Sequence, residues 1–333
     1  MGGKGERSTL DEGFLASLEA YRTILDAAFE TKLEDLLIGA SIGKTAFLVP
    51  ALSDGKKVRG CLTCVIGEAL GASLESVVPR AVAIELIQAA TLIHDDFIDQ
   101  DRVRRARPAV WTVEGARRAV LVGDVIFAGA IAMMSEMSRE DGLAASRAIA
   151  LVSAGALQEP LALVDLAALL GRAPTFGGLY EKIIHLKTGI LFGAACELGA
   201  IAARAPADLR DAARRYGLRT GEAYQIADDL KEVRAYVRAR SARPEQMAAI
   251  APALLCFAKE SGPDILRFLE QGCVSLTDGM LDLLMAAQKP MEEEIKARLL
   301  CAASEIEGLF PANRASRLAK EAPWGTISLF NAS

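Results

Sequence analysis

Apolar residues recur every three or four positions along most of the chain, which is the spacing of one face of an α-helix. Phe14, Leu18, Tyr21, Leu25 and Phe29, for example, form one apolar stripe on an expected first helix. Ala and Leu dominate the sequence, and it contains no run of alternating β-branched residues bounded by turns. The pattern therefore predicts an all-α protein.

Segments containing proline, several of them with glycine as well, separate the expected helices. They occur at residues 49–55, 71–79, 102–111, 172–178, 205–206, 239–244 and 261–263. Most of the stretches between them are about 15 to 30 residues long, which exceeds the average length of a soluble helix. No Ser/Gly-rich linker and no shift in composition divides the sequence, so we expect residues 1–333 to form a single large domain.

Composition excludes several classes of protein. Hydrophobic residues make up 52% of the chain, enough for a sizeable core, and 38 basic residues stand against 43 acidic ones. A general nucleic-acid binder would carry a basic excess instead. The N-terminus has no apolar core of the kind that a signal peptide needs, and the longest apolar stretch, 119–134, contains Asp124 and is shorter than a bilayer span. The six cysteines form no disulfide framework, which fits reduced thiols in a cytoplasm. From these observations together we expect a cytoplasmic protein without a transmembrane segment or a nucleic-acid partner.

An acidic cluster ends the helix that is expected to begin after Pro79. Gln88, Thr91, Asp95 and Asp99 are spaced three or four apart and fall on one face of this helix. Carboxylates one turn apart repel each other by about 0.2–0.5 kcal/mol, so local helix stability does not favour them. They are suitable oxygen ligands for Mg²⁺, which completes its coordination with water and phosphate. The cluster is therefore a candidate metal site.

A second acidic cluster has the same spacing. Gln225, Asp228 or Asp229, and Glu232 fall on one face of another expected helix. A single cluster of this kind is more often a solvated helix face than a metal site. The residues that precede both clusters are largely apolar, however, so both clusters border buried surface. We expect the two helices to form a negatively charged mouth over an apolar cavity.

Basic residues lie near the expected helix ends. Lys56 and Arg59 open one helix, the arginine-rich segment 102–107 follows the first acidic cluster, and Lys187 interrupts an apolar segment. Arginine is suited to bidentate phosphate contacts and lysine to point-charge contacts. Each of these residues alone is best explained as a solvated surface charge. Together with the acidic clusters they favour a site for diphosphate groups.

Five motifs in a fixed order give the chain a resemblance to a known family. They are Gly-Lys-x-x-Arg at 55–59, the acidic cluster at 95–99 followed by Arg104-Arg105, Val122-Gly-Asp124, Lys187-Thr188, and Gln225-x-x-Asp228-Asp229. Over about residues 45 to 235 the chain resembles the trans-polyprenyl diphosphate synthases of the all-α isoprenoid synthase family. Five ordered motifs are far more specific than any one of them. The C-terminal part is divergent.

The resemblance implies a single bundle of long helices around a deep central cavity, usually in a homodimer. It also implies an enzyme, a transferase in which several Mg²⁺ ions bridge the diphosphate of an allylic substrate. Isopentenyl diphosphate attacks the cation left when that diphosphate departs, and the product is a linear polyprenyl diphosphate. Such chemistry needs charge stabilisation of the leaving group in a dry pocket and no nucleophilic side chain.

The resemblance assigns roles to individual residues. The metal ligands would be Asp95, Asp99 and Asp228, supported by Asp96 and Asp229. The allylic diphosphate would contact Arg104, Lys187 and Gln225, and isopentenyl diphosphate would contact Lys56, Arg59, Gln88 and Arg105. Thr188 and Gln225 would lie beside the cation, so that the catalytic set is Lys187, Thr188 and Gln225.

The residues before the first acidic motif bear on product length. In the family, bulky aromatic residues four and five positions upstream stop growth at about fifteen carbons. This chain has Thr91 and Ala90 there, and small residues imply a product of about twenty carbons or more. A floor lower in the cavity would have to come from other side chains, for which the candidates are Ile84, Ile87, Phe127 and Met134.

The sequence departs from the family pattern in three places. Glu232 stands where the family has Asp, and Ala106 replaces a Gly. The segment after the second acidic motif, 233–244, contains arginines where the family has a loop rich in Gly and Lys. Arg238, Arg240 and Arg243 are the candidates to replace the missing lysines.

These departures leave alternatives open. One is a terpene cyclase or a prenyltransferase with another acceptor, and another is a non-catalytic partner subunit of a prenyl diphosphate synthase. Retention of Lys56, Arg59 and Arg105 argues against a cyclase, which needs only one diphosphate site. The intact acidic ligands argue against a non-catalytic subunit.

Overall fold

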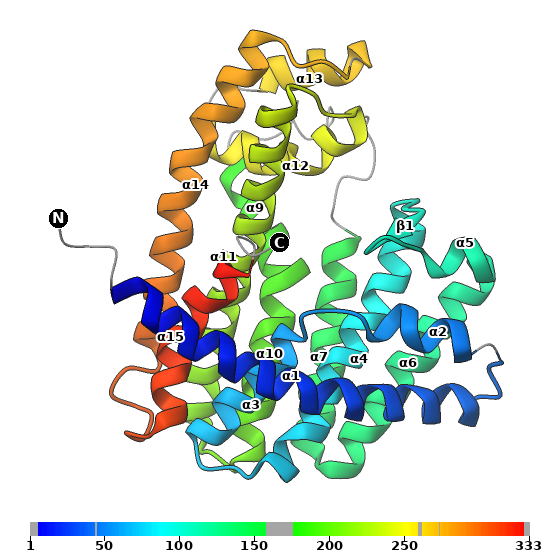
Figure 1. The fold of residues 1–333 in the computed structure, drawn as a ribbon, viewed down its shortest axis with the longest axis vertical. Coiled ribbons are helices and arrows are strands. Elements are labelled where there is room, and N and C mark those ends of the chain that lie inside the picture. The colour runs from blue at the N-terminus through cyan, green and yellow to red at the C-terminus, as the bar shows by residue number, and fades with distance from the viewer. Residues whose placement is uncertain (1–5, 44, 158–175, 259–261, 273, 330–333) are drawn as a thin grey trace.

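The computed structural model describes residues 6–43, 45–157, 176–258, 262–272 and 274–329, and this part of the protein is helical almost throughout (Figure 1). In chain order its helices are α1 (Glu6–Gly39), α2 (Thr45–Ser53), α3 (Val58–Ala69), α4 (Leu74–Ile98), α5 (Val110–Glu114), α6 (Ala116–Met137), α7 (Arg139–Ala156), α9 (Phe176–Ile184), the π-helical turn η1 (His185–Gly189), α10 (Ile190–Ala202), α11 (Ala207–Ala239), α12 (Pro244–Phe257), α13 (Gly262–Gln271), α14 (Asp278–Glu305) and α15 (Arg314–Ser328). The expectation of an all-α fold is confirmed.

The described helices pack around two apolar clusters. The first contains buried residues of α3, α4, α6, α7 and α10, such as Leu62 and Ile84, and α1 lies across α3, α4 and α6 on one side (Figure 1). The second contains residues of α9, α11, α12, α13 and α14, such as Met247. The 33-residue helix α11 takes part in both, with Tyr216 in the first and Tyr236 in the second. α11 therefore connects the two halves of the structure.

Two glycines allow the central helices to approach closely. A Cβ atom at Gly199 of α10 would lie 2.5 Å from the carbonyl oxygen of Thr63 in α3. A Cβ atom at Gly217 of α11 would lie 2.3 Å from the carbonyl oxygen of Phe192 in α10. Both distances are far inside van der Waals contact with backbone atoms, so any other residue would push these helices apart.

The apolar stripe expected on the first helix is confirmed where its side chains are described. Leu18, Leu25 and Phe29 are buried and Tyr21 is half-buried. The side chain of Phe14 lies outside the described residues, as does most of the break expected at 172–178.

The helix that carries the first acidic cluster begins earlier than expected. α4 starts at Leu74, before Pro79, because the hydroxyl oxygen of Ser73 caps it by accepting a hydrogen bond from the backbone N–H of Ser76. Glu75 adds negative charge in the first turn, where the helix dipole favours it. The cap therefore outweighs the proline as a start signal.

The segment between α4 and α5 contains a small hairpin that the sequence did not predict. β1 (Val103–Arg104) pairs antiparallel with β2 (Arg107–Pro108), and the two turn residues Arg105 and Ala106 have φ angles of 51° and 61°. Left-handed turns of this kind normally contain Asn or Gly, and this segment has neither. The turn chemistry therefore gave no signal for a hairpin.

Three described helical segments are as long as expected, and they are also strongly apolar. By length and composition alone, 74–98, 116–137 and 178–202 could cross a membrane. Most of the residues in the first and third segments are buried inside the protein, which accounts for their apolar character. α6 is less covered, and its exposed side chains include Leu121 and Met137.

Candidate active site

A cavity of about 790 Å³ opens between the end of α4, the turn η1, helix α11 and the start of α12. Three residues selected from the sequence line it together, namely Asp99, Lys187 and Gln225. Asp229 and Glu232 of the second acidic cluster line the same cavity. The structure thus brings residues of both acidic clusters and a lysine to one opening, where the apolar flanks of the clusters led us to expect a shared mouth.

A chain of hydrogen bonds runs along the wall of this cavity. The Thr188 hydroxyl donates to Oε1 of Gln225 across 2.6 Å, and Nε2 of Gln225 donates to Oδ1 of Asp229 across 2.9 Å. The Tyr180 hydroxyl donates to the other carboxylate oxygen of Asp229 across 2.5 Å. Burial raises the pKa of Asp229 to about 7, although both of these hydrogen bonds act to lower it. These hydrogen bonds together fix the orientation of the Gln225 amide.

The neighbouring carboxylates are also held in a partly desolvated environment. Burial raises the pKa of Asp228, and the positive charges of Lys231, Lys187 and Lys56 oppose that effect. Burial likewise raises the pKa of Glu232, whose Oε2 accepts a hydrogen bond from the Tyr236 hydroxyl at 3.0 Å. Raised carboxylate pKa values indicate that these groups would be stabilised by a bound cation.

The donor set of this site fits Mg²⁺ shared with a substrate. Asp95 lies in the last turn of α4, Asp99 is the residue that caps its C-terminus, and Asp228 lies on α11, so all the side-chain donors are hard oxygen atoms. Within the described residues no three His, Cys, Asp or Glu side chains converge closely enough to hold a metal ion alone. Mg²⁺ usually keeps several waters and takes further oxygens from phosphates, so this arrangement suits it when a phosphate ligand is present.

Lys187 and Thr188 lie in a π-helical turn. η1 interrupts the helical path between α9 and α10, and it contains both residues. π-Helical turns are rare, and those that occur are frequently found at functional sites. The sequence indicated only that polar residues interrupt an apolar segment.

Besides Lys187, the site has a second group of cations, made of Lys56, Arg59 and Arg105, near the acidic residue Asp228. Arg59 is stacked over the ring of Phe192, with 4.7 Å between the guanidinium carbon and the ring centroid, and its Nε is buried without a hydrogen-bond partner among the described residues. Arg105 reaches back from the hairpin to Gly55, where an added Cβ would lie 2.8 Å from its Nη1. Burial lowers the pKa of Lys56, and the nearby charges of Lys231 and Arg105 lower it further. Positive charges gathered in this way favour the binding of an anionic ligand between them.

Lys56 also contacts the C-terminal helix. Its Nζ donates a hydrogen bond to the backbone carbonyl oxygen of Leu329 across 2.7 Å, at the end of α15. The adjacent Lys57 is a structural residue, because its Nζ donates to the carbonyl of Ser53 across 2.6 Å and lies over the ring of Phe29. The basic motif at 55–59 therefore divides between the candidate site and the core.

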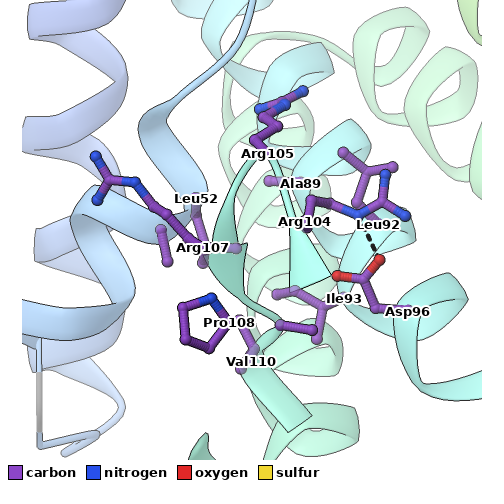
Figure 2. A pocket seen from close by; sticks show the side chains of 12 residues that line it. Leu52, Ala89, Leu92, Ile93, Asp96, Arg104, Arg105, Arg107, Pro108 and Val110 are labelled. Atoms are coloured by element: carbon purple, nitrogen blue, oxygen red, sulfur yellow. Dashed lines mark hydrogen bonds and ion pairs between the residues drawn. The ribbon is translucent and has the colours of Figure 1, made fainter. Parts of the chain in front are cut away.

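Arg104 lies apart from the second group of cations. Figure 2 shows its guanidinium directed at the carboxylate of Asp96, whereas Arg105 and Arg107 project elsewhere. This ion pair borders a small cavity of about 30 Å³ between α2, α4 and the hairpin. Burial raises the pKa of Asp96, and the charge of Arg104 opposes that effect. The structure thus places Arg104 as the ion-pair partner of the second aspartate of the motif.

Of the three candidate arginines in the segment after the second acidic cluster, only Arg243 lines the large cavity. Arg240 forms an ion pair with Asp278, with 3.0 Å between Nη2 and Oδ1, and Arg238 is exposed in the last turn of α11. Gln88 is half-buried on α4. Position alone therefore makes Arg243 the best placed of the three to meet a ligand.

Sequence reasoning missed several residues that support the site. Tyr180 and Tyr236 donate to acidic residues of the second cluster, and Glu222 and Arg298 form a buried ion pair behind it. Tyr180 is 49 residues from its partner Asp229, and Arg298 is 76 residues from Glu222. No local pattern marks such pairs, so only a three-dimensional structure could find them.

Comparison with known proteins agrees with this geometry. The sequence profile of the polyprenyl synthetase family matches residues 45–237. The chain is 35% identical over 176 residues to (2E,6E)-farnesyl diphosphate synthase of Mycobacterium tuberculosis. This match covers 53% of this chain and 48% of that enzyme. It is 32% identical over 239 residues to geranylgeranyl diphosphate synthase of the same organism, covering 67% of this chain and 68% of that enzyme.

A solved structure extends the likeness over nearly the whole chain. Polyprenyl synthase from Caulobacter crescentus CB15, complexed with calcium and isoprenyl diphosphate, has a TM-score of 0.67 at 25% identity, covering 94% of this chain and 97% of its own. By sequence, in contrast, the match spans only about half the length of the farnesyl diphosphate synthase. The match of the family profile to more than half of the chain shows that this protein belongs to the polyprenyl synthetase family.

Proposed function

We propose that the protein is a Mg²⁺-dependent prenyltransferase that condenses isopentenyl diphosphate with an allylic diphosphate to form a linear polyprenyl diphosphate. One observation carries this proposal. The carboxylates of Asp99, at the end of α4, and of Asp229 and Glu232 on α11 share a cavity with Lys187. The separate group of Lys56, Arg59 and Arg105 lies nearby. Two charged subsites match a reaction between two diphosphates, whereas a cyclase needs one.

The allylic diphosphate would occupy the acidic mouth. Asp95, Asp99 and Asp228 would hold Mg²⁺, which would neutralise the charge that develops on the departing diphosphate. Lys187 lines the same cavity and would donate a charged hydrogen bond to the diphosphate. The proposal thus gives the two acidic helices one shared ligand.

The hydrogen-bonded wall would act on the allylic carbons. The hydroxyl of Thr188 and the amide of Gln225 are already bonded to each other, so their dipoles need no reorientation when positive charge forms. The apolar surface around the site would exclude water, which otherwise would capture the cation. The proton lost after condensation would go to the released diphosphate.

Isopentenyl diphosphate would bind the second cationic group. Lys56, Arg59, Gln88 and Arg105 would hold it, and the unpaired Nε of Arg59 supports this assignment because a buried guanidinium nitrogen favours an anionic acceptor. Gly55 lets the Arg105 guanidinium approach the same place. The acceptor would then lie beside the allylic substrate.

We further propose a homodimer and a product of about twenty carbons or more. The incompletely covered face of α6, with Leu121 about half exposed, supports an interface with a second copy. The small residues Ala90 and Thr91 support the product length. Light scattering of the purified protein tests the first statement.

The direct test is to incubate the purified protein with Mg²⁺, labelled isopentenyl diphosphate and each short allylic diphosphate in turn, and to size the extracted prenols. A ladder that ends at one length supports the proposal. Asp228→Asn should remove incorporation, whereas the exposed control Asp208→Asn should not. Absence of incorporation by folded wild-type protein with every primer would contradict it and would favour a non-catalytic subunit or another acceptor.

A further inference from the structure

A buried arginine from the C-terminal part of the chain joins three carboxylates behind the candidate site. Arg298 of α14 is 8% exposed, and it lies outside the segment that matches the family profile. Its Nη1 lies 2.5 Å from Oε2 of Glu222, its Nη2 lies 2.5 Å from Oε1 of Glu181, and its Nε lies 2.7 Å from Oε1 of Glu294. One guanidinium therefore ties α9, α11 and α14 together.

Glu222 is the centre of this cluster. It is 3% exposed, and it also accepts from Arg219, with 3.0 Å between Nη1 and Oε2. Nδ1 of His185 lies 2.8 Å from Oε1 of Glu222 and must donate if the carboxylate is ionised. Burial by itself would raise the pKa of Glu222, but the hydrogen bond from His185 and the charges of Arg298 and Arg219 lower it below its usual value. Glu222 is thus a buried anion that depends on its cationic partners.

The cluster touches both ends of the π-helical turn. His185 is the first residue of η1 and Gly189 is the last. A Cβ atom at Gly189 would lie 3.1 Å from Cγ of Glu222, so glycine lets the Glu222 side chain pack directly against the turn. Lys187 and Thr188 lie between these two contacts. The position of Glu222 therefore determines the position of the turn that carries them.

A second link joins the same helices on the cavity side. Glu181, which binds Arg298 through both carboxylate oxygens, follows Tyr180, which donates to Asp229. Glu222 precedes Gln225 by three residues on α11, so Gln225 lies about one helical turn from the cluster. The arginine cluster and the Thr188–Gln225–Asp229–Tyr180 chain thus hold η1 and α9 against α11 from two sides.

We propose that Arg298 is a positioning residue for Lys187 and Thr188. This inference rests on the proposed function, because it gives the turn a role in binding the allylic diphosphate. The guanidinium does not line the cavity. It acts by neutralising Glu222 and Glu181, which fixes the π-helical turn before substrate arrives. This preorganisation keeps the Lys187 ammonium and the Thr188 hydroxyl in place without reordering during the reaction.

The kinetic test compares Arg298→Met with a matched control. Arg215→Met removes another ion pair between α11 and α14, in which Nε of Arg215 lies 2.7 Å from Oε2 of Glu305. We expect Arg298→Met to lower kcat about tenfold or to raise KM for the allylic diphosphate about tenfold, with KM for isopentenyl diphosphate within about twofold of wild type. Arg298→Lys should restore part of the loss, and Arg215→Met should leave all three values unchanged. Wild-type values in a folded Arg298→Met protein would overturn the proposal.

Hydrogen exchange of the unliganded protein gives a readout that does not require turnover. We expect peptides covering 180–190 to exchange faster in Arg298→Met or, where that variant does not fold, in Arg298→Lys, and to exchange at the wild-type rate in Arg215→Met. Unchanged exchange in the Arg298 variants would overturn the proposal. If wild-type protein incorporates no isopentenyl diphosphate, the proposed function fails, and this measurement still decides whether Arg298 positions the turn.

Discussion

Thr188 and Gln225 come from different helical segments, and the hydroxyl of the first donates to the side-chain carbonyl of the second across 2.6 Å. Because Gln225 then donates its amide hydrogen to Asp229, the direction of every hydrogen bond in this chain is set. This chain of hydrogen bonds places a fixed dipole at the wall of the cavity. Removing either member should therefore affect chemistry more than stability.

The first prediction concerns this dipole. Thr188→Val keeps the shape of the side chain and removes the hydroxyl, so it should lower kcat by about 10- to 100-fold. The matched control is Thr220→Val, because the buried hydroxyl of Thr220 only donates to the carbonyl of Tyr216 in its own helix. Steady-state kinetics of both variants, with thermal unfolding to check the fold, test this. Equal loss in the two variants would show that the hydroxyl of Thr188 has no special role.

The second prediction concerns metal and diphosphate. Burial raises the pKa values of Asp228 and Glu232, which favours a bound cation beside them, so chelation of Mg²⁺ should abolish turnover without unfolding the protein. With Mg²⁺ and inorganic pyrophosphate present at about 100 times Kd, wild-type protein should gain about 2.7 kcal/mol in its free energy of unfolding. Asp95→Ala and Asp228→Asn should lose most of this gain.

Differential scanning calorimetry with and without the two ligands measures the effect, and circular dichroism verifies that chelation leaves the helices intact. Asp208→Asn, on the exposed start of α11, is the control and should retain the full gain. A ligand-induced rise in Tm that survives in Asp228→Asn would contradict the metal assignment.

The local part of this structure could be predicted from the sequence, and the non-local part could not. The stripe of Leu18, Leu25 and Phe29 follows from helical periodicity, and the spacing of Asp95 and Asp99 placed them on one helix face. These inferences need only neighbouring residues. That the two acidic clusters share one cavity followed from the apolar residues that flank them and from the resemblance to a family.

The π-helical turn and the arginine cluster lacked any such signal. A π-helix differs from an α-helix by one residue in hydrogen-bond register, and the segment around Lys187 reads as an ordinary interrupted helix. The partners of Arg298 lie on three different helices, two of them far away in sequence. The hairpin at 103–108 was missed for a different reason, because Arg105 and Ala106 occupy conformations that favour other residues.

The third prediction follows from that hairpin. Ala106 has a φ of 61°, in the left-handed region that costs a residue with a Cβ about 1–2 kcal/mol. Ala106→Gly should therefore stabilise the protein by about 0.5–1 kcal/mol, the relief of strain exceeding the added flexibility of the unfolded chain. Urea unfolding measures the change. Ala235→Gly, inside α11, should instead destabilise the protein by about the same amount, and a stabilising effect there would show that another cause acts.

The fourth prediction concerns acid stability. The pKa of Glu222 is lower in the folded protein than in the unfolded chain, so the folded state gains stability above the unfolded pKa and loses it as pH falls through the folded pKa. The groups that face Glu222 are Arg219 on its own helix, His185 on η1 and Arg298 on α14. Glu222→Gln should be less stable than wild type at pH 6, and the difference should shrink below about pH 4.

Urea unfolding at pH 6 and pH 3.5 measures both differences. Carboxylates away from the cluster titrate alike in both proteins and cancel in the comparison, so the pH-dependent difference reports Glu222 and the groups that share its partners. A difference that stays constant between the two pH values would show that the lost contact is steric rather than electrostatic.

The fifth prediction concerns product length. Thr91 is 8% exposed and lies one turn before Asp95 on α4, so it follows the metal ligands down the same face. Ala90 is completely buried in the first apolar cluster, and a phenyl group there would overpack the core at a cost of about 1–3 kcal/mol. Thr91→Phe is therefore the better test of the cavity floor.

In Thr91→Phe the phenyl ring should close the space below the metal ligands, because a growing chain must pass the first turn before Asp95. Chromatography of the extracted prenols should show a shorter main product at a comparable rate of isopentenyl diphosphate incorporation. Loss of incorporation together with a large fall in Tm would indicate a packing defect, and Thr91→Leu, with less added volume, should then still shorten the product. A product of unchanged length from a folded variant would place the limit deeper, at Phe127 or Met134, both of which belong to the packed interior around α6.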